Sequence, residues 1–150
     1  MLGELALTGR AKETIVLIGG ENIEPQPIED ALKESPYLSQ IMVVGQDKKH
    51  LGALIVLNFD AIRDWLAARG AGGGTSPEEI CRREDVYALV KKELHRLMTE
   101  ERGFKYYERI PRVVLLEREF AVGEELTQTM KMRRSVIAEK YAAQIEALFR

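Results

Sequence analysis

Residues 41–57 read Ile-Met-Val-Val-Gly-Gln-Asp-Lys-Lys-His-Leu-Gly-Ala-Leu-Ile-Val-Leu, and this stretch decides the fold. Apolar runs at 41–44 and 51–57 flank a polar loop at 46–50, a pattern typical of two connected strands. The second run shows no polar alternation from residue 53 onward, so we expect that strand to be buried on both faces.

Further strands and helices are expected on either side of this pair. Short apolar runs predict strands at 4–8, 14–18 and 112–116, the first two forming an N-terminal β-hairpin around a turn at 9–12. Apolar residues at helical spacing predict helices at 60–69, 76–102 and 135–149, and another from Pro25 to the Ser35-Pro36 pair. Strands and helices interleave without a strict βαβ repeat. The predicted fold class is therefore α+β, with a small mixed β-sheet flanked by helices in one domain over residues 1–150.

Local signals mark where two of these helices begin. Asp60 is expected to cap the helix at 60–69 with its side chain. Ser76 and Glu79 have the spacing of a capping box, and Pro77 occupies the first helical position between them. A break in the long helix that follows is expected near Glu84-Asp85.

Composition indicates a soluble cytoplasmic domain. The 150 residues are 45% hydrophobic and 31% charged, and a net charge of -2 gives no electrostatic case for binding nucleic acid. No apolar run approaches the roughly 20 residues of a membrane span, and the first residues lack the features of a secretion signal. The only cysteine, Cys81, excludes an internal disulfide and is expected to be a bystander in a helix.

Two motifs near the ends of the chain carry the functional signal. Residues 7–25 read Leu-Thr-Gly-Arg-Ala-Lys-Glu-Thr-Ile-Val-Leu-Ile-Gly-Gly-Glu-Asn-Ile-Glu-Pro, and residues 126–134 read Leu-Thr-Gln-Thr-Met-Lys-Met-Arg-Arg. Taken alone, Arg10 is either a phosphate or carboxylate ligand or a solvated turn residue. Gly19-Gly20 either lets a ligand approach the backbone or only forms a turn. Lys131 either reaches an anion or is solvated beside two arginines.

Together the two motifs resemble the C-terminal lid domain of adenylate-forming acyl-CoA synthetases, the long-chain fatty acid type in particular. The resemblance covers almost the whole chain. It implies that Lys131 is catalytic, bridging the acyl carboxylate and the α-phosphate of ATP during adenylation. Gln128 departs from the family pattern, which has proline there, so a looser approach to Lys131 is expected.

The front motif carries the other implied functional residues. By the resemblance, Arg10 contacts the ribose and phosphate region of the adenylate, and Lys12 is the hinge of the lid. The remaining implied cofactor-binding residues belong to the loop that lines the pantetheine tunnel: Gly19, Gly20, Glu21 and Asn22. Glu29 and Asp30 also follow the motif, and we expect them to cap or form ion pairs rather than take part in chemistry.

The resemblance further implies that the chain is a fragment, inactive alone. Its partner would be the large N-terminal domain of the same polypeptide, and the parent would convert a fatty acid, ATP and CoA to acyl-CoA, AMP and pyrophosphate. ATP, CoA and Mg²⁺ would serve the parent, which would be cytoplasmic or peripheral to a membrane, and none would be tightly bound to this chain. The alternative is a free-standing docking or regulatory module with no chemistry.

A metal enzyme is a poor third hypothesis. His50 and His95 are isolated in the sequence, and neither a Cys-x-x-Cys nor a His-Glu-x-x-His motif occurs. We expect no metal site in the chain, and His95 is expected on a helix surface.

Overall fold

The fold is built on a three-stranded sheet. The computed structural model describes residues 13–71 and 75–150, so the expected strand at 4–8, Arg10 and Lys12 lie outside the described residues. The sheet has the order β3–β4–β5, formed by Leu38–Val44, Gly52–Leu57 and Arg112–Leu116. β4 pairs antiparallel with β3 and parallel with β5, so the sheet is mixed, as predicted.

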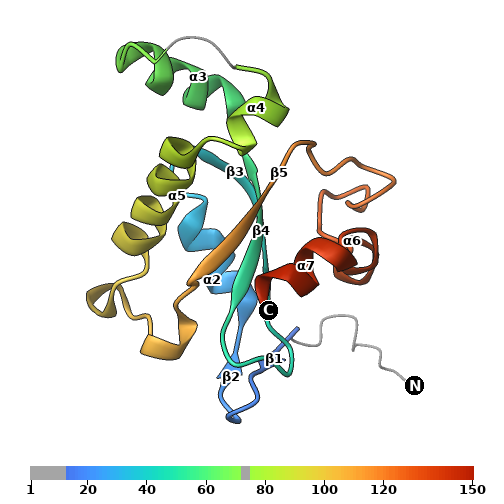
Figure 1. The fold of residues 1–150 in the computed structure, drawn as a ribbon. Helices are drawn as coiled ribbons and strands as arrows, with labels where there is room; N and C mark the ends of the chain where they lie inside the picture. Colours follow the sequence, from blue (N-terminus) through green and yellow to red (C-terminus); the bar gives the residue numbers. More distant parts are fainter. Residues whose placement is uncertain (1–12, 72–74) are drawn as a thin grey trace.

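Helices cover both faces of this sheet. α2 (Pro25–Leu32) and α5 (Glu84–Leu97) lie on one side in Figure 1, and α6 (Arg134–Lys140) and α7 (Ala142–Leu148) lie on the other. Every residue of β4 is buried. Its side chains alternate between the two cores, because successive residues of a strand point to opposite faces. The prediction of a strand buried on both sides is therefore confirmed.

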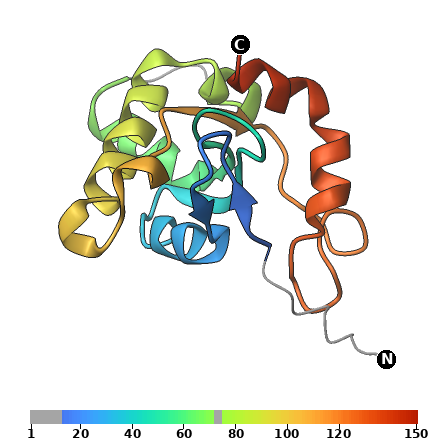
Figure 2. The same ribbon diagram turned by 90° about the horizontal axis from the view of Figure 1, so that it is seen from below.

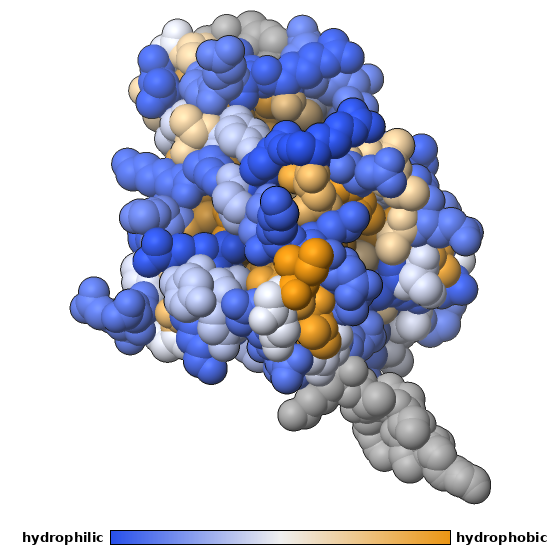
Figure 3. Space-filling model, turned by 60° about the horizontal axis from the view of Figure 1, so that its bottom comes forward, coloured by the Kyte–Doolittle hydropathy of each residue, from blue (hydrophilic) through white to orange (hydrophobic). Residues whose placement is uncertain are grey.

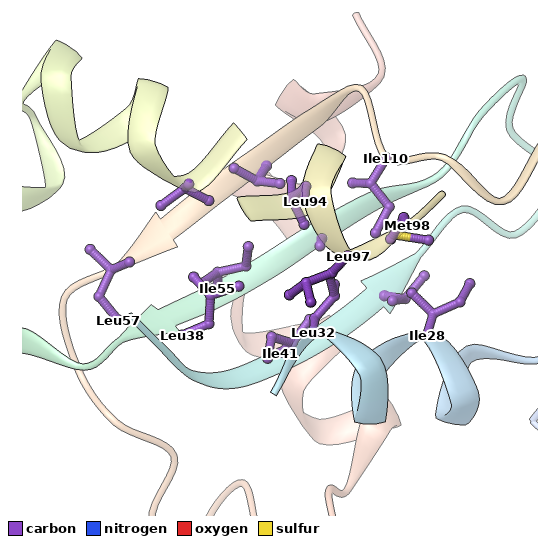
Figure 4. Close-up of a cluster of buried hydrophobic side chains, with 14 of the residues drawn as sticks. Ile28, Leu32, Leu38, Ile41, Ile55, Leu57, Leu94, Leu97, Met98 and Ile110 are labelled. Carbon is purple, nitrogen blue, oxygen red and sulfur yellow. The ribbon is translucent and has the colours of Figure 1, made fainter. Parts of the chain in front are cut away.

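The larger core lies between the sheet and helices α2 and α5. Figure 4 shows Leu32 of α2 and Leu97 of α5 meeting over the sheet beside Ile41 and Ile55. The smaller core lies between the opposite face of the sheet and helices α6 and α7. Its buried members are Met42, Val44, Leu54, Val56, Leu116, Phe120, Leu126, Ile137 and Leu148. A sheet that is apolar on both faces requires both layers, since either face alone would meet water.

Two helix starts test the expected caps. α3 (Phe59–Ala68) begins one residue earlier than predicted, because Asn58 Oδ1 accepts a hydrogen bond from Ala61 N at 3.1 Å. Asp60 as the cap was wrong, since it lies in the first turn instead.

The predicted capping box at the next helix is confirmed. Ser76 Oγ accepts a hydrogen bond from Glu79 N at 3.2 Å, and Ser76 N donates to Glu79 Oε1 at the same distance. These bonds start α4 (Pro77–Cys81), with proline at the first helical position. The long helix predicted at 76–102 is interrupted two residues earlier than expected, because α4 ends at Cys81 and α5 starts at Glu84.

The last predicted helix is also divided. The backbone of Tyr141, with φ −109° and ψ 26°, leaves the helical region and separates α6 from α7. After α5, single turns of 3₁₀ helix occupy Glu100–Arg102 and Tyr106–Glu108 and lead the chain to β5. β5 itself has the predicted bounds.

The described residues contain a hairpin that was not predicted. β1 (Ile15–Val16) pairs antiparallel with β2 (Asn22–Ile23) around a turn at Gly19-Gly20. The predicted hairpin with its turn at 9–12 falls largely outside the described residues and stays a prediction. Gly20 has φ +93°, a conformation that glycine adopts without the steric cost of a side chain. The strand expected at 14–18 is therefore short, and β2 was not predicted.

The fold class is α+β, as predicted from the sequence. Among residues 13–71 and 75–150, none of the helices combines the length and the apolar character that a membrane span requires.

The buried centre of β4 generates a stability prediction. Ile55→Ala should lower the free energy of unfolding by about 2–5 kcal/mol, because Ile55 is fully buried and the substitution leaves a cavity. Ile18→Ala is the matched control, since Ile18 is 70% exposed, and it should change stability by less than about 0.5 kcal/mol. Urea unfolding of both variants measures the difference, and equal losses would contradict the placement of β4.

Candidate functional site

Lys131 ends a tight turn that is closed by its own hydrogen bonds. Thr127 N donates to Lys131 O at 2.8 Å, and Lys131 N donates to Thr127 Oγ1 at 3.1 Å. Met130 has φ +66° and donates its N–H to Thr127 O at 2.9 Å. These bonds define the turn even though Gln128 stands where proline would fix the backbone.

The Lys131 side chain is free to meet an anion. Lys131 is exposed, and within the described part of the chain its ammonium forms no ion pair. At the base of the turn, Leu126 and Met132 form an antiparallel bridge, and Arg133 N donates to Glu125 O at 2.8 Å. Lys131 is therefore an exposed cation on a short turn whose two ends are held in place. This arrangement suits contact with an anion that is bound to another domain.

Glu125 strengthens one side of that base. Its side chain is buried, accepts a hydrogen bond from Ala121 N at 2.9 Å, and forms an ion pair with Lys140 of α6. Burial raises the pKa of Glu125, but the hydrogen bonds from Lys140 and from the backbone outweigh this effect. The pKa of Glu125 therefore lies below its usual value.

An ion pair between Arg134 and Glu29 secures the other side of the base. Arg134 Nη1 and Nη2 donate to Glu29 Oε2 and Oε1 at 2.7 and 2.5 Å. Glu29 is 1% exposed, and its Oε2 also accepts a hydrogen bond from Val43 N at 2.8 Å. The expectation of a structural role for Glu29 is confirmed. Arg134, one of the two arginines that follow Lys131, is thus partly buried and paired with a carboxylate.

The Gly19-Gly20 loop forms the second candidate region. Gly20 N donates to Leu17 O at 2.9 Å, and Leu17 N donates to Glu21 O at 3.0 Å. A Cβ on Gly20 would meet nothing within 4 Å, so the backbone there is open to solvent. Asn22 is exposed in β2, and Glu21 is half-buried. The loop is thus an open surface feature that another molecule can approach.

The hairpin is held against the β3–β4 loop. Ile18 N donates to Lys48 O and Asp47 N donates to Val16 O, both at 2.9 Å. Ile18 itself is 70% exposed. Figure 3, which brings the underside of the molecule forward, shows apolar residues emerging among hydrophilic ones on this side.

A cavity of about 500 Å³ lies beside the loop, between the hairpin, α5 and the segment before β5. Glu21 lines it, together with three basic residues, Lys49, Lys91 and Arg109. The Lys91 ammonium donates to the carbonyls of Ile110 and Pro111, and burial lowers its pKa. Because Glu21 and Glu100 also line the cavity, neither sign of charge dominates it. Sequence reasoning did not find this cavity, since its lining residues come from four separate segments.

The candidate residues fall into two separate groups. Figures 1 and 2 show the hairpin and the Lys131 segment in different parts of the molecule. Arg10 and Lys12 lie outside the described residues, so their predicted roles remain predictions. The structure therefore presents two regions rather than one assembled site.

Metal chemistry finds no support in the described residues. Between residue 13 and residue 150, apart from 72–74, no group of three or more His, Cys, Asp or Glu side chains could hold a metal ion. His95 is exposed on α5, as expected, and His50 packs its ring against Phe149 at 5.3 Å. Burial raises the pKa of Cys81 to about 11, which makes it a poor nucleophile at neutral pH.

Comparison with known proteins assigns the chain to a family. Residues 12–69 match the model of the AMP-binding enzyme C-terminal domain. The chain is 35% identical over 148 residues to the long-chain-fatty-acid–CoA ligase FadD15 of Mycobacterium tuberculosis, and 32% identical over 164 residues to ACSBG1 of Homo sapiens, with the same activity in its name. The chain belongs to the AMP-binding enzyme C-terminal domains. Both alignments cover 98% of this chain but only 24% and 22% of the relatives, in their C-terminal part.

Solved structures support the same fold. The adenylation domain of a carboxylate reductase from Mycobacterium chelonae superimposes with a TM-score of 0.71 at 22% identity, covering 91% of this chain and 19% of that chain. A fatty acyl CoA synthetase from Mycobacterium tuberculosis gives a TM-score of 0.52 at 19% identity, covering 88% of this chain and 20% of that chain. At these identities the likeness shows a shared fold alone.

Glu125 generates a pH-dependence prediction. Because its folded-state pKa is lowered, the stability it contributes is present above the ordinary pKa of an unfolded glutamate and is lost as the pH falls through the folded value. Glu125→Gln should therefore be less stable than the parent chain at pH 7, and the difference should shrink in acid. Glu124→Gln is the control, since that carboxylate is largely exposed. Thermal unfolding between pH 2 and 7 measures both, and a difference independent of pH would contradict the assignment.

Proposed function

We propose that this chain is the lid domain of a long-chain fatty acid–CoA ligase. The parent would activate a fatty acid with ATP to an acyl-adenylate and then transfer the acyl group to CoA. The observation that carries the proposal is similarity over 98% of the chain to ligases of this name, in a segment that is their C-terminal part. That similarity does not favour the alternative of a free-standing docking module.

Lys131 is the proposed catalytic residue of the adenylation step. Negative charge builds around the α-phosphorus as the fatty acid carboxylate attacks and pyrophosphate leaves. An ammonium held there stabilises that charge. The exposed position of Lys131 and its lack of an ion pair support this role, because no carboxylate among the described residues competes for the cation.

The Gly19-Gly20 loop is proposed to act in the second step. Gly19, Gly20, Glu21 and Asn22 would line the path of the pantetheine arm, and the open backbone at Gly20 would leave room for it. The separation of the Gly19-Gly20 loop from Lys131 supports a lid that presents first one surface and then the other to the active site. Rotation about Lys12 would exchange them, and Arg10 would contact the adenylate.

The remaining parts of the reaction would be supplied by a large N-terminal domain, the proposed partner of this chain. ATP and CoA would bind where the two domains meet, and Mg²⁺ would arrive with the ATP phosphates. The parent is proposed to be cytoplasmic or peripheral to a membrane. Its acceptor is open to test, because a relative of 36% identity is a long-chain-fatty-acid–[acyl-carrier-protein] ligase of Arabidopsis thaliana, AEE15. CoA and carrier protein should therefore be compared as acceptors.

Lys131→Ala in the full-length polypeptide should separate the two half-reactions. Adenylation, measured as ATP–pyrophosphate exchange, should fall on the order of 10²–10³-fold, because a preorganised charge contact is lost. Acyl transfer to CoA from supplied acyl-adenylate should change by less than about threefold, since Lys131 has no role there. Lys92→Ala on the exposed face of α5 is the matched control and should leave both rates intact. Equal losses in both half-reactions would disprove the assignment.

Lys12→Pro tests the hinge. Proline fixes φ near −65° and should hinder the rotation, so acyl transfer should fall more than adenylation. The same two assays measure the effect, with Lys12→Ala as the control that keeps the backbone free. Unchanged acyl transfer would show that Lys12 is not the hinge.

A further inference from the structure

We propose that Arg134 is a positioning residue for Lys131. Its bidentate ion pair with buried Glu29 fixes the base of the exposed turn that carries the lysine. The inference rests on the proposed role of Lys131 in adenylation and adds a residue through which that role is maintained.

The turn cannot position Lys131 by burial of its own residues. All five residues from 127 to 131 are exposed, so the internal hydrogen bonds set its shape but not its place on the domain. That place must come from its two ends. One end is anchored by Leu126, which is 4% exposed in the smaller core. The other end enters α6 at Arg134, three residues after Lys131.

Arg134 anchors the second end with defined geometry. Two parallel N–H···O bonds to one carboxylate fix the plane of the guanidinium group, and a single point charge would not do so. The Arg134 side chain is 16% exposed and that of Glu29 is 1% exposed, so solvent screens the pair weakly. Glu29 is itself tied to the outer edge of β3 through Val43 N. The start of α6 is thereby connected to the central sheet.

A third contact connects Arg134 to the N-terminal segment. Arg134 Nε lies 3.1 Å from Glu13 Oε2, and Glu13 directly follows the proposed hinge residue Lys12. Glu13 is 57% exposed, so this second pair is weaker than the one with Glu29. Arg134 thus lies where the segment after the proposed hinge, α2 and the Lys131 turn meet.

Loss of this anchor should affect the reaction through Lys131. A displacement of about 1 Å in a catalytic group can reduce the rate on the order of 10²-fold. In the full-length polypeptide, Arg134→Gln should therefore reduce ATP–pyrophosphate exchange by roughly that factor. Acyl transfer from supplied acyl-adenylate should change by less than about threefold, because that step does not use Lys131.

Two further variants separate positioning from folding. Arg134→Gln leaves the Glu29 charge buried without its partner, which can destabilise the domain. The double variant Glu29→Gln with Arg134→Gln removes both charges and retains an oxygen that can accept from Val43 N, so it should fold and still lose adenylation. Arg133→Gln is the matched control, because Arg133 is exposed and its side chain bonds only the Glu124 carbonyl among the described residues.

A cycle with Lys131→Ala decides the inference. If Arg134 acts through Lys131, then adding Arg134→Gln to Lys131→Ala should reduce the rate of ATP–pyrophosphate exchange by less than about twofold. That would be a strong departure from additivity. The positioning role would be overturned if Arg134→Gln reduced adenylation as much in the Lys131→Ala variant as in the parent. Equal losses in both half-reactions would overturn it as well. If Lys131→Ala reduces adenylation but Arg134→Gln does not, only the present inference fails. If Lys131→Ala itself leaves adenylation intact, the proposed catalytic role fails, and the positioning role fails with it.

Discussion

The burial of β4 on both faces is the constraint on which the rest of the structure depends. A strand whose side chains are apolar on both sides must be covered twice, because each exposed face would leave apolar area in water. α2 and α5 cover one face, and α6 and α7 cover the other. The proposed functional segments are extensions of this arrangement. The hairpin precedes the helix of the first layer, and the Lys131 turn precedes the helices of the second.

Charge is used differently in the interior and at the surface of this domain. Glu29 and Glu125 are both buried, and each is paired with a basic residue of α6, Arg134 or Lys140. Buried carboxylates are costly unless they are paired and hydrogen-bonded, so these two contacts constrain where α6 begins. Lys131, in contrast, has no such partner in the described part of the chain. Because Arg134 and Lys140 are paired while Lys131 forms no ion pair with a described residue, the Lys131 ammonium is the one available to a ligand.

The sequence predicted those features that depend on neighbouring residues. The strands at 41–44 and 112–116, the proline start of α2 and the Ser76 capping box are set by local patterns, and the structure has them. The pairing of β1 with β2, the interruption at Tyr141 and the cap by Asn58 were missed, because each depends on backbone geometry that several sequences share.

Long-range contacts at the candidate site were beyond reach for a different reason. The Arg134–Glu29 pair joins residues 105 positions apart, and nothing in either motif specifies its partner. The residues around Lys131 left two interpretations open, a solvated side chain or a ligand for an anion. The family resemblance favoured the second. The cavity beside Glu21 likewise exists only after four segments come together. The residues of the candidate site were therefore named from sequence, but their supports were not.

The parallel pairing of β4 with β5 has a consequence for how the domain is made. α3, α4 and α5 lie between the two strands in the chain, so this pairing closes a long loop and is expected to form slowly. During synthesis, β4 emerges with one edge unpaired and one apolar face uncovered, which is a template for association with other chains. The segment that ends this vulnerable period contains β5, the Lys131 turn and the helices of the second layer. A nascent chain therefore gains protection from aggregation and its proposed catalytic cation from the same stretch of polypeptide.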